Sequence, residues 1–293
     1  MVEDNEIKAQ VSPFAIREGE IKTFDGKDGY VSMNQIVHKI NIGHITDIHF
    51  AILDLVNEFE FITSRQIYKM LEIKGIDPKS QDKLNNKLDA LVKSKILTRY
   101  YFTSDEGKGI YRIYCLEKMG KYLLTSKEVE CKWQPSDNTK PVPMIKKRLA
   151  GNQVLIAYLR KVKAFDSYTV KPALTAKTLG KVFKATGGSV KLTKNNKSIQ
   201  FLFEAVRREF DWKKKLVEKM NLYKDFYENF QPGDSGFAGL PQLILVCEDE
   251  KHMAECFKEI VTNKVEIPQI KLLFTTDLRQ NKETLDETLV EFK

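Results

Sequence analysis

The sequence predicts an α+β protein built from two domains, and three observations lead to this fold class. At 293 residues with 42% apolar content, the chain is long enough to bury two hydrophobic cores. Its first half shows three short amphipathic segments and then two strand-like runs, whereas its second half alternates apolar strands with helices. An irregular, proline-bearing stretch separates the halves. We therefore expect an N-terminal arm (1–44), a first domain (45–126), a linker (127–148) and a second domain (149–293).

The arm mixes glycines with short apolar patches, which predicts irregular structure with one or two short strands. Apolar residues then recur at helical spacing from Ile45 to Val56 and predict a helix over 46–58. Thr63 and Gln66 have the spacing of a capping box and open a second helix, which ends at Gly75. Ser80 opens a third helix, because its hydroxyl can accept a hydrogen bond from a free amide of the first turn. The apolar face of this third helix consists of Leu84, Leu88, Leu91 and Val92.

Two strand-like runs follow the third helix, over 97–103 and 110–116. The polar loop between them contains Gly107 and Gly109, and a short glycine-bearing loop between such runs is typical of a β-hairpin. The next segment, "EKMGKYLLTSK", predicts a helix packed beneath the hairpin. Three helices followed by a hairpin have the order of a winged helix-turn-helix, so we expect the first domain to be such a module.

The linker contains three prolines and no clear hydrophobic period. Helical spacing resumes in "NQVLIAYLRKVKAF", and the stretch between the first two strands that follow it is expected to be irregular or briefly helical. Because strands and helices then alternate, the second domain is predicted to be a small mixed sheet with helices on its faces. The expected strands cover 167–171, 188–193, 199–206, 242–247 and 270–275, and the expected helices cover 211–229 and 250–262.

The net charge of +8 is unevenly distributed along the chain. Residues 127–215 carry a net charge of +14 and residues 61–126 carry +6, whereas 1–60 and 216–293 each carry −6. Duplex DNA presents about one phosphate charge per 1.7 Å of its axis, so a basic block between acidic ends indicates a nucleic-acid partner. A solvated lysine-rich surface is the alternative explanation of the same bias.

Several short motifs together resemble the replication-relaxation-like family. In the first half they are "KLDALVKSKILTRYYF", the glycine-bearing loop and "IYRIYCLEKMGKYLL". The resemblance spans roughly residues 45 to 280 and implies a winged helix followed by a degenerate domain related to the PD-(D/E)-x-K restriction endonucleases. It also implies a DNA-binding protein of a plasmid, phage or integrative element, acting in replication, conjugative transfer or transcriptional regulation. The matching positions of the second half are Glu204, Lys219, Tyr223, Pro241, Thr275 and Thr276.

The same resemblance raises the question of metal-dependent cleavage. Nucleases of the PD-(D/E)-x-K class hold Mg²⁺ with two carboxylates, while a lysine orients the attacking water. Glu204 offers one carboxylate, but Val206 stands in the lysine position and the preceding hairpin "GGSVKLTKNNKSIQFLF" contains no aspartate. We therefore expect no catalytic residue and no cofactor, with Glu204 as a structural carboxylate. A metal-dependent DNA-nicking enzyme centred on Glu204 is retained as an alternative.

Other catalytic and metal sites are not indicated. The chain has no Gly-x-x-x-x-Gly-Lys-Ser/Thr loop and no Gly-x-Ser-x-Gly sequence. The four cysteines, Cys115, Cys131, Cys247 and Cys256, are scattered singly. The four histidines, His38, His44, His49 and His252, also lack the spacing of metal ligands. We therefore expect no bound metal.

The winged-helix prediction leads to a set of DNA contacts. The third helix of such a module enters the major groove, and the hairpin touches the DNA backbone or minor groove. The predicted contacts are Arg65, Gln81, Lys83, Asn86, Lys87, Lys108 and Arg112, with Lys146, Lys147 and Arg148 in the linker. A secondary basic surface is predicted from Arg207, Arg208, Lys213, Lys214 and Lys215.

The sequence therefore predicts a sequence-specific protein that binds double-stranded DNA, with a second copy of itself or a replication or transfer protein as a further partner. A winged helix that serves only in protein interaction is the other alternative. The polar N-terminus and the lack of an apolar run of eighteen residues predict neither a secretory signal nor a membrane span, and hence a cytoplasmic protein.

Overall fold

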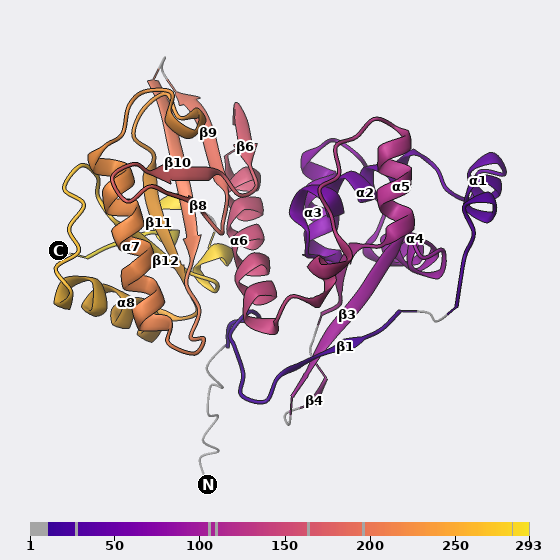
Figure 1. Cartoon of the computed structure of the whole chain (residues 1–293), viewed down its shortest axis with the longest axis horizontal. Coiled ribbons are helices and arrows are strands. Elements are labelled where there is room, and N and C mark those ends of the chain that lie inside the picture. Colours follow the sequence, from indigo (N-terminus) through magenta and orange to yellow (C-terminus); the bar gives the residue numbers. More distant parts are fainter. Residues whose placement is uncertain are drawn as a thin grey trace, which may run out of the picture.

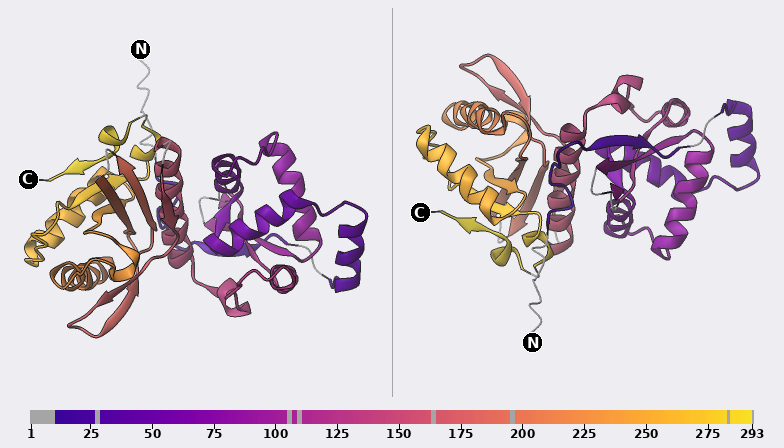
Figure 2. Two further views of the ribbon diagram at one scale, coloured as in Figure 1. Left: turned by 90° about the horizontal axis from the view of Figure 1, so that it is seen from above. Right: turned by 90° about the horizontal axis from the view of Figure 1, so that it is seen from below.

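The computed structural model describes residues 11–26, 29–104, 107–108, 111–162, 165–194, 197–282 and 284–292. These residues form two lobes on either side of one long helix, α6 (Val142–Lys161), as Figure 1 shows. The views from above and below place α6 between the same two groups of elements (Figure 2). The mixed α and β structure expected from the sequence is confirmed.

The N-terminal lobe combines helices with an antiparallel sheet of strand order β1-β3-β5-β2, to which β4 adds by pairing with β3. Its helices are α1 (Met33–Asn41), α2 (Asp47–Phe59), α3 (Ser64–Ile73), α4 (Gln81–Lys93) and α5 (Lys118–Ser126). Its strands are β1 (Ile21–Phe24), β2 (Ile62–Thr63), β3 (Leu97–Ser104), β4 (Gly107–Lys108) and β5 (Ile113–Leu116). A 3-10 turn over Pro135–Thr139 precedes α6.

Local sequence signals begin and end the helices of this lobe. The Thr63 hydroxyl accepts a hydrogen bond from the Gln66 amide at 3.2 Å, and the Gln66 side chain accepts one from the Thr63 amide at 3.1 Å. Gly75 follows α3 with a φ of +73°, a conformation that favours glycine. Ser80 caps α4 by accepting from the Lys83 amide at 3.2 Å. The capping box and the serine cap predicted from the sequence are both present.

The second lobe is built on a sheet of strand order β13-β12-β11-β10-β9-β6. The central strands β10, β11 and β12 are parallel, while β6, β9 and β13 pair antiparallel to their neighbours. The strands are β6 (Ser167–Thr169), β9 (Ser189–Lys194), β10 (Lys197–Ala205), β11 (Gln242–Cys247), β12 (Leu273–Thr276) and β13 (Val290–Glu291), with a separate hairpin of β7 (Ala173–Ala176) and β8 (Lys181–Lys184). The helices are α7 (Trp212–Glu228), α8 (Glu250–Thr262) and α9 (Leu285–Thr288), with 3-10 turns at Asp234–Gly236 and Arg279–Asn281.

Helices cover both faces of this sheet. On one face Tyr158 of α6 packs edge-on against Phe203 of β10, with 4.6 Å between ring centroids. On the other face Leu202 lies in a second apolar cluster with Met220 of α7 and Cys256 of α8. Because side chains alternate along a strand, neighbouring residues of β10 serve the two opposite clusters.

The two lobes share a continuous apolar cluster. The cluster runs from the buried faces of α2, α3 and α4 through α6 to Phe203 and Ile244 of the second sheet. Polar contacts reinforce the junction: Gln66 Nε2 donates to the Leu149 carbonyl at 2.9 Å, and Asn152 Nδ2 donates to the Phe61 carbonyl at 2.7 Å. The helix that belongs to the second domain by sequence therefore completes the core of the first.

The N-terminal segment also joins the lobes. Ser12 donates a hydrogen bond to Asp277 beyond β12, and the Phe14 ring meets the Tyr111 ring at 5.5 Å between centroids. Further along, β1 extends the sheet of the N-terminal lobe by pairing with β3. Between these points Glu20 pairs with Lys146 of α6 at 2.5 Å, and the side chains of both residues are buried. Residues 12–24 thus form a strap along both lobes.

Three segments differ from the expected secondary structure. The arm contains the helix α1, capped by Ser32 and anchored by Ile36, which is fully buried. Helix α6 begins at Val142, so residues 142–148 of the expected linker are helical; Pro143 lies in the first turn, where the missing amide hydrogen has no helical acceptor to serve. The stretch expected to be irregular forms the β7–β8 hairpin. None of the helices in the described part of the chain is both long and apolar enough to cross a lipid bilayer.

The ion pair between Glu20 and Lys146 gives a test of the strap. Replacing Lys146 with alanine leaves a buried carboxylate without its cation, so we expect the free energy of unfolding to fall by about 3–5 kcal/mol, as measured by urea denaturation. Lys224, which pairs with Glu228 on the exposed side of α7, provides the control. Lys224→Ala should cost less than about 1 kcal/mol, and an equally small loss for Lys146→Ala would contradict the buried pair.

Candidate nucleic-acid interface

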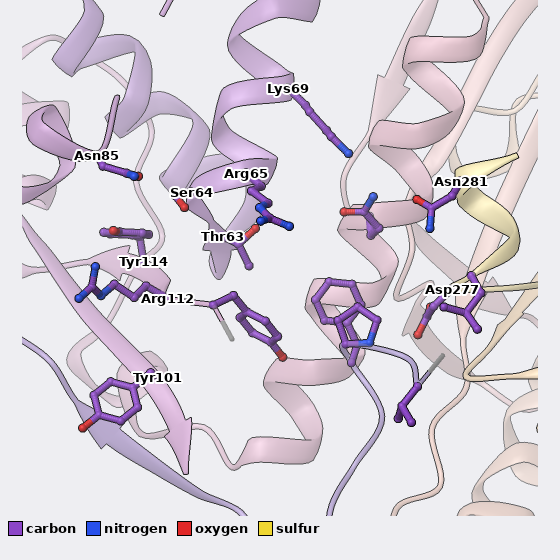
Figure 3. Close-up of a pocket in the computed structure, with 16 residues that line it drawn as sticks. Thr63, Ser64, Arg65, Lys69, Asn85, Tyr101, Arg112, Tyr114, Asp277 and Asn281 are labelled. Carbon is purple, nitrogen blue, oxygen red and sulfur yellow. The ribbon is translucent and has the colours of Figure 1, made fainter. Parts of the chain in front are cut away.

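A cleft of about 670 Å³ opens between the two lobes. Elements of the N-terminal lobe form one wall, and the opposite side is formed by α6 and the turn after β12. Figure 3 shows Arg65 and Lys69 projecting from α3 toward this space, with Asn281 across it. A cleft of this size has room for a small ligand or a short stretch of nucleic-acid backbone, but not for a whole duplex.

The cleft collects some of the predicted DNA contacts. Arg65, at the first turn of α3, and Arg112, just before β5, both line it and are exposed. Lys69 and Asn85 line it as well, although the sequence did not single them out. Lys69 follows Arg65 by one helical turn, and that spacing on a predicted helix could have indicated that both side chains share a face.

The exposed face of α4 carries the predicted reading residues. Lys83 and Asn86 are exposed, whereas Lys87 and Gln81 are partly buried. Gln81 Nε2 donates to Asn85 Oδ1 at 3.2 Å, so this amide is engaged within the helix. Burial lowers the pKa of His49 on α2, and the Lys87 ammonium lowers it further. Lys87 therefore lies near α2, and Lys83 and Asn86 are the outward-facing pair.

The hairpin contributes cations that are partly neutralised. Arg112 Nε lies 2.9 Å from Asp25 Oδ2, and its side chain is 52% exposed, which leaves much of the guanidinium free for another partner. Arg99 pairs with the same aspartate at 3.1 Å and with Asp89 of α4. Lys108 lies in β4, and its side chain is outside what the structure describes.

The structure does not support the three basic residues 146–148 as DNA contacts. Lys146 is buried against Glu20, and Arg148 is buried with its Nη1 donating to the Thr186 carbonyl at 2.8 Å. Burial lowers the pKa of Arg148 to about 10. Lys147 is partly exposed, but its Nζ lies 2.5 Å from a carboxylate oxygen of Glu209. Their burial and pairing correct the prediction, because the stretch is part of a core helix and not a solvated linker.

The predicted secondary basic surface is also corrected. Arg207 is fully buried and donates to Asp277 at 2.7 Å, so it links the segments that follow β10 and β12. Arg208 is shared among the carboxylates that follow β11 and line α8, at 2.6 Å from Asp249 and 3.2 Å from Glu255. Lys213 and Lys215 lie 3.7 and 2.8 Å from Glu259 and Glu209, whereas Lys214 is exposed and has no ion pair among the described residues.

Glu204 is buried at the end of β10 and is surrounded by donors from the chain itself. One carboxylate oxygen accepts from the Thr186 hydroxyl at 3.0 Å. The other accepts from the Thr186 amide at 3.2 Å and from the Tyr223 hydroxyl at 2.7 Å, and Lys219 Nζ lies 3.6 Å from it. Burial raises the pKa of Tyr223, and the Glu204 carboxylate raises it further, so the phenol stays a donor.

This environment suits a structural carboxylate better than a metal ligand. A metal site would need a second carboxylate beside Glu204, but the contact there is made by Thr186. Val206 is buried at the position where the PD-(D/E)-x-K motif has its lysine. Every oxygen of Glu204 already has a donor, so a divalent cation would have to displace them. Lys219 and Tyr223, one turn apart on α7, thus hold the Glu204 carboxylate in place.

Three dispersed residues come together in the second core, which the sequence did not indicate. The side chains of Cys247, His252 and Cys256 are buried, and their ligand atoms lie within 4.8 Å of one another. His252 Nδ1 accepts from the Glu248 amide at 3.2 Å, so in the neutral ring the proton resides on Nε2. That nitrogen then has no lone pair for a metal. The Trp212 ring lies 4.7 Å from the imidazole in an edge-on arrangement.

Comparisons with known proteins give little more. No protein-family model matches the sequence, and none of the curated proteins matches it. Among solved structures, the chain is similar to the restriction endonuclease FokI, with a TM-score of 0.27 and 10% sequence identity over 82% of this chain. The match covers 45% of the endonuclease chain, so the present chain corresponds to under half of it. We draw no activity from so loose a likeness, and membership of the replication-relaxation-like family stays a prediction.

The environment of Glu204 predicts that its replacement lowers stability and that the wild-type protein does not cleave DNA. Glu204→Gln keeps the shape but removes the charge that Lys219 faces, so we expect a loss of about 1–3 kcal/mol in urea denaturation. We expect no nicking of supercoiled plasmid by the wild-type protein with Mg²⁺ or Mn²⁺. Metal-dependent nicking by the wild type that Glu204→Gln abolishes would restore the nuclease interpretation.

His252 predicts a specific pH dependence. Burial, followed by the charges of Arg208 and Arg207, lowers the pKa of His252 to about 3, while Asp249 opposes this shift. Between pH 6.5 and 3 the unfolded chain binds a proton that the folded chain does not, so stability falls as the pH falls, by about 1.4 kcal/mol per unit. Denaturation curves between pH 7.5 and 5 should show the fall in the wild type and in the exposed control His38→Asn. The same slope in His252→Asn would exclude His252 as its source.

Proposed function

We propose that the protein binds double-stranded DNA through its N-terminal lobe, with α4 in the major groove. The observation that carries the proposal is that α4 buries Leu84 and Leu88 while it presents Lys83 and Asn86 to solvent. Beside this face the cleft wall adds the cation of Arg65. A helix that is apolar inside and carries amide and ammonium groups outside has the chemistry of a major-groove reader.

The order of the surrounding elements supports this assignment. Helices α2, α3 and α4 pack on one another and are followed by β3 and β5, with β2 adding a third strand. This is the order of a winged helix-turn-helix, in which the β3–β5 hairpin is the wing. Asn86 would then read a base edge, while Lys83 and Arg112 would contact phosphates.

Use of the lobe for protein interaction alone is less well supported. The acidic residues Asp82 and Asp89 lower the charge of α4, but Asp89 is paired with Arg99 of β3. Arg65 is exposed and forms no ion pair within the described residues, so it keeps its charge for a partner. The role in plasmid or phage replication, transfer or regulation comes from the sequence resemblance alone and stays a prediction, as does the nuclease-like ancestry of the second lobe.

Salt-dependent binding tests the proposal. Each phosphate contact contributes about 0.9 to the slope of log K against log salt concentration, so Lys83→Ala should reduce the slope by about 1 and weaken binding. We would measure fluorescence anisotropy with labelled genomic and plasmid fragments between 50 and 200 mM salt. Lys258→Ala, an exposed lysine on α8, is the control.

An unchanged slope in Lys83→Ala would remove α4 from the interface. If the wild type bound no fragment even at the lowest salt concentration, DNA binding itself would be wrong, and a protein partner would be sought instead.

A further inference from the structure

Helices α3 and α6 lie side by side across the junction of the lobes. Gln66 of α3 donates to the Leu149 carbonyl of α6 at 2.9 Å and to Gln153 Oε1 at 3.4 Å. Arg65 and Lys69 are one turn apart on α3, and Gln153 and Arg160 are about two turns apart on α6. Each pair therefore shares a face of its helix. Arg65, Lys69 and Gln153 line the cleft, and Arg160 lies farther along α6 on the face of Gln153.

Three cations lie near this junction and act on one another electrostatically. Lys69 is partly buried, and burial lowers its pKa; the charges of Arg160 and then Arg65 lower it further. Glu72 acts in the opposite direction, but less strongly than either arginine. Among the described residues, none of Arg65, Lys69 and Arg160 forms an ion pair. Like charges held together without an ion pair repel one another. An anion that enters the cluster therefore stabilises it.

The cleft adds neutral donors next to the cations. The amide groups of Gln153 and Asn281 line it, and Figure 3 shows Lys69 directed across the space toward the side where Asn281 lies. A tetrahedral oxyanion can accept from guanidinium, ammonium and amide donors at once, and arginine pairs with phosphate through two parallel hydrogen bonds.

We propose that Arg65, Lys69 and Arg160 form a phosphate-binding site at the junction of the two lobes, and that it takes a backbone phosphate of bound DNA. The choice of DNA as the source of that phosphate rests on the proposed function. The phosphate of a free nucleotide is the other source with the same chemistry. Because Arg160 belongs to α6, a phosphate here makes the second lobe part of the DNA contact.

The first experiment tests the site without DNA. Inorganic pyrophosphate is added to the purified full-length chain, and the melting temperature is compared with that in chloride at equal ionic strength. At about ten times the dissociation constant we expect a rise on the order of 2–5 °C in the wild type and in Lys258→Ala. The rise should disappear in Arg160→Ala and Lys69→Ala and return in Arg160→Lys. An equal rise in the wild type and in Arg160→Ala, or no rise in the wild type, would overturn the site.

The second experiment distinguishes the source of the phosphate. In the DNA titrations, Arg160→Ala should reduce the salt slope by about 1, in addition to the effect of Lys83→Ala. An unchanged slope for Arg160→Ala, with the pyrophosphate response intact in the wild type, would overturn DNA as the source while α4 binding stands. A wild type that responds to pyrophosphate but binds no DNA would reject the proposed function and leave a site for free phosphate compounds.

Discussion

The structure depends on the burial of α6 from both sides. Residues from Ile145 to Leu159 are almost all buried, because one side of the helix packs on α3 and the other on the sheet around β10. A helix that is buried on opposite sides cannot stand at a solvated boundary between independent domains. The two lobes therefore share one core, and their relative position follows from the packing of α6 rather than from a linker. The cleft between them exists because that packing holds its two walls apart.

The same constraint accounts for the strap formed by residues 12–24. The two lobes adjoin near the N-terminal end of α6, and the strap covers this seam. It forms one buried ion pair with Lys146 and one hydrogen bond with Asp277. Asp277 is held between Ser12 and Arg207, and burial raises its pKa. Opening of the lobes would break this ion pair and this hydrogen bond together with the contacts between α3 and α6. A ligand in the cleft would contact both lobes and oppose that opening.

The second lobe shows how a carboxylate at the end of a central strand can have a structural role. Glu204 stands at the end of a central strand, where functional residues of α/β sheets often lie. Its oxygens are nevertheless occupied by Thr186 and Tyr223, and Lys219 provides the counter-charge. Basic residues that look available in the sequence, such as Arg207 and Arg208, are used in the same way against nearby carboxylates. Arg65, Lys83 and Arg160 are exposed cations outside these ion pairs, on α3, α4 and the end of α6.

The sequence by itself determined the helices α2 to α4, the caps of α3 and α4, and the strands of the second sheet other than β13, because hydrophobic periodicity and capping act over a few residues. It also indicated Arg65, Lys83 and Asn86 as exposed polar positions, since the buried stripe of an amphipathic helix defines the opposite face. Only the tertiary structure decided which lysines and arginines form ion pairs within the protein. Glu20 and Lys146, or Arg207 and Asp277, are distant in sequence, and no local pattern reports such a pairing. The meeting of Lys69 with Arg160, and that of Cys247 with His252 and Cys256, likewise depend on how helices pack, which is a property of the whole core.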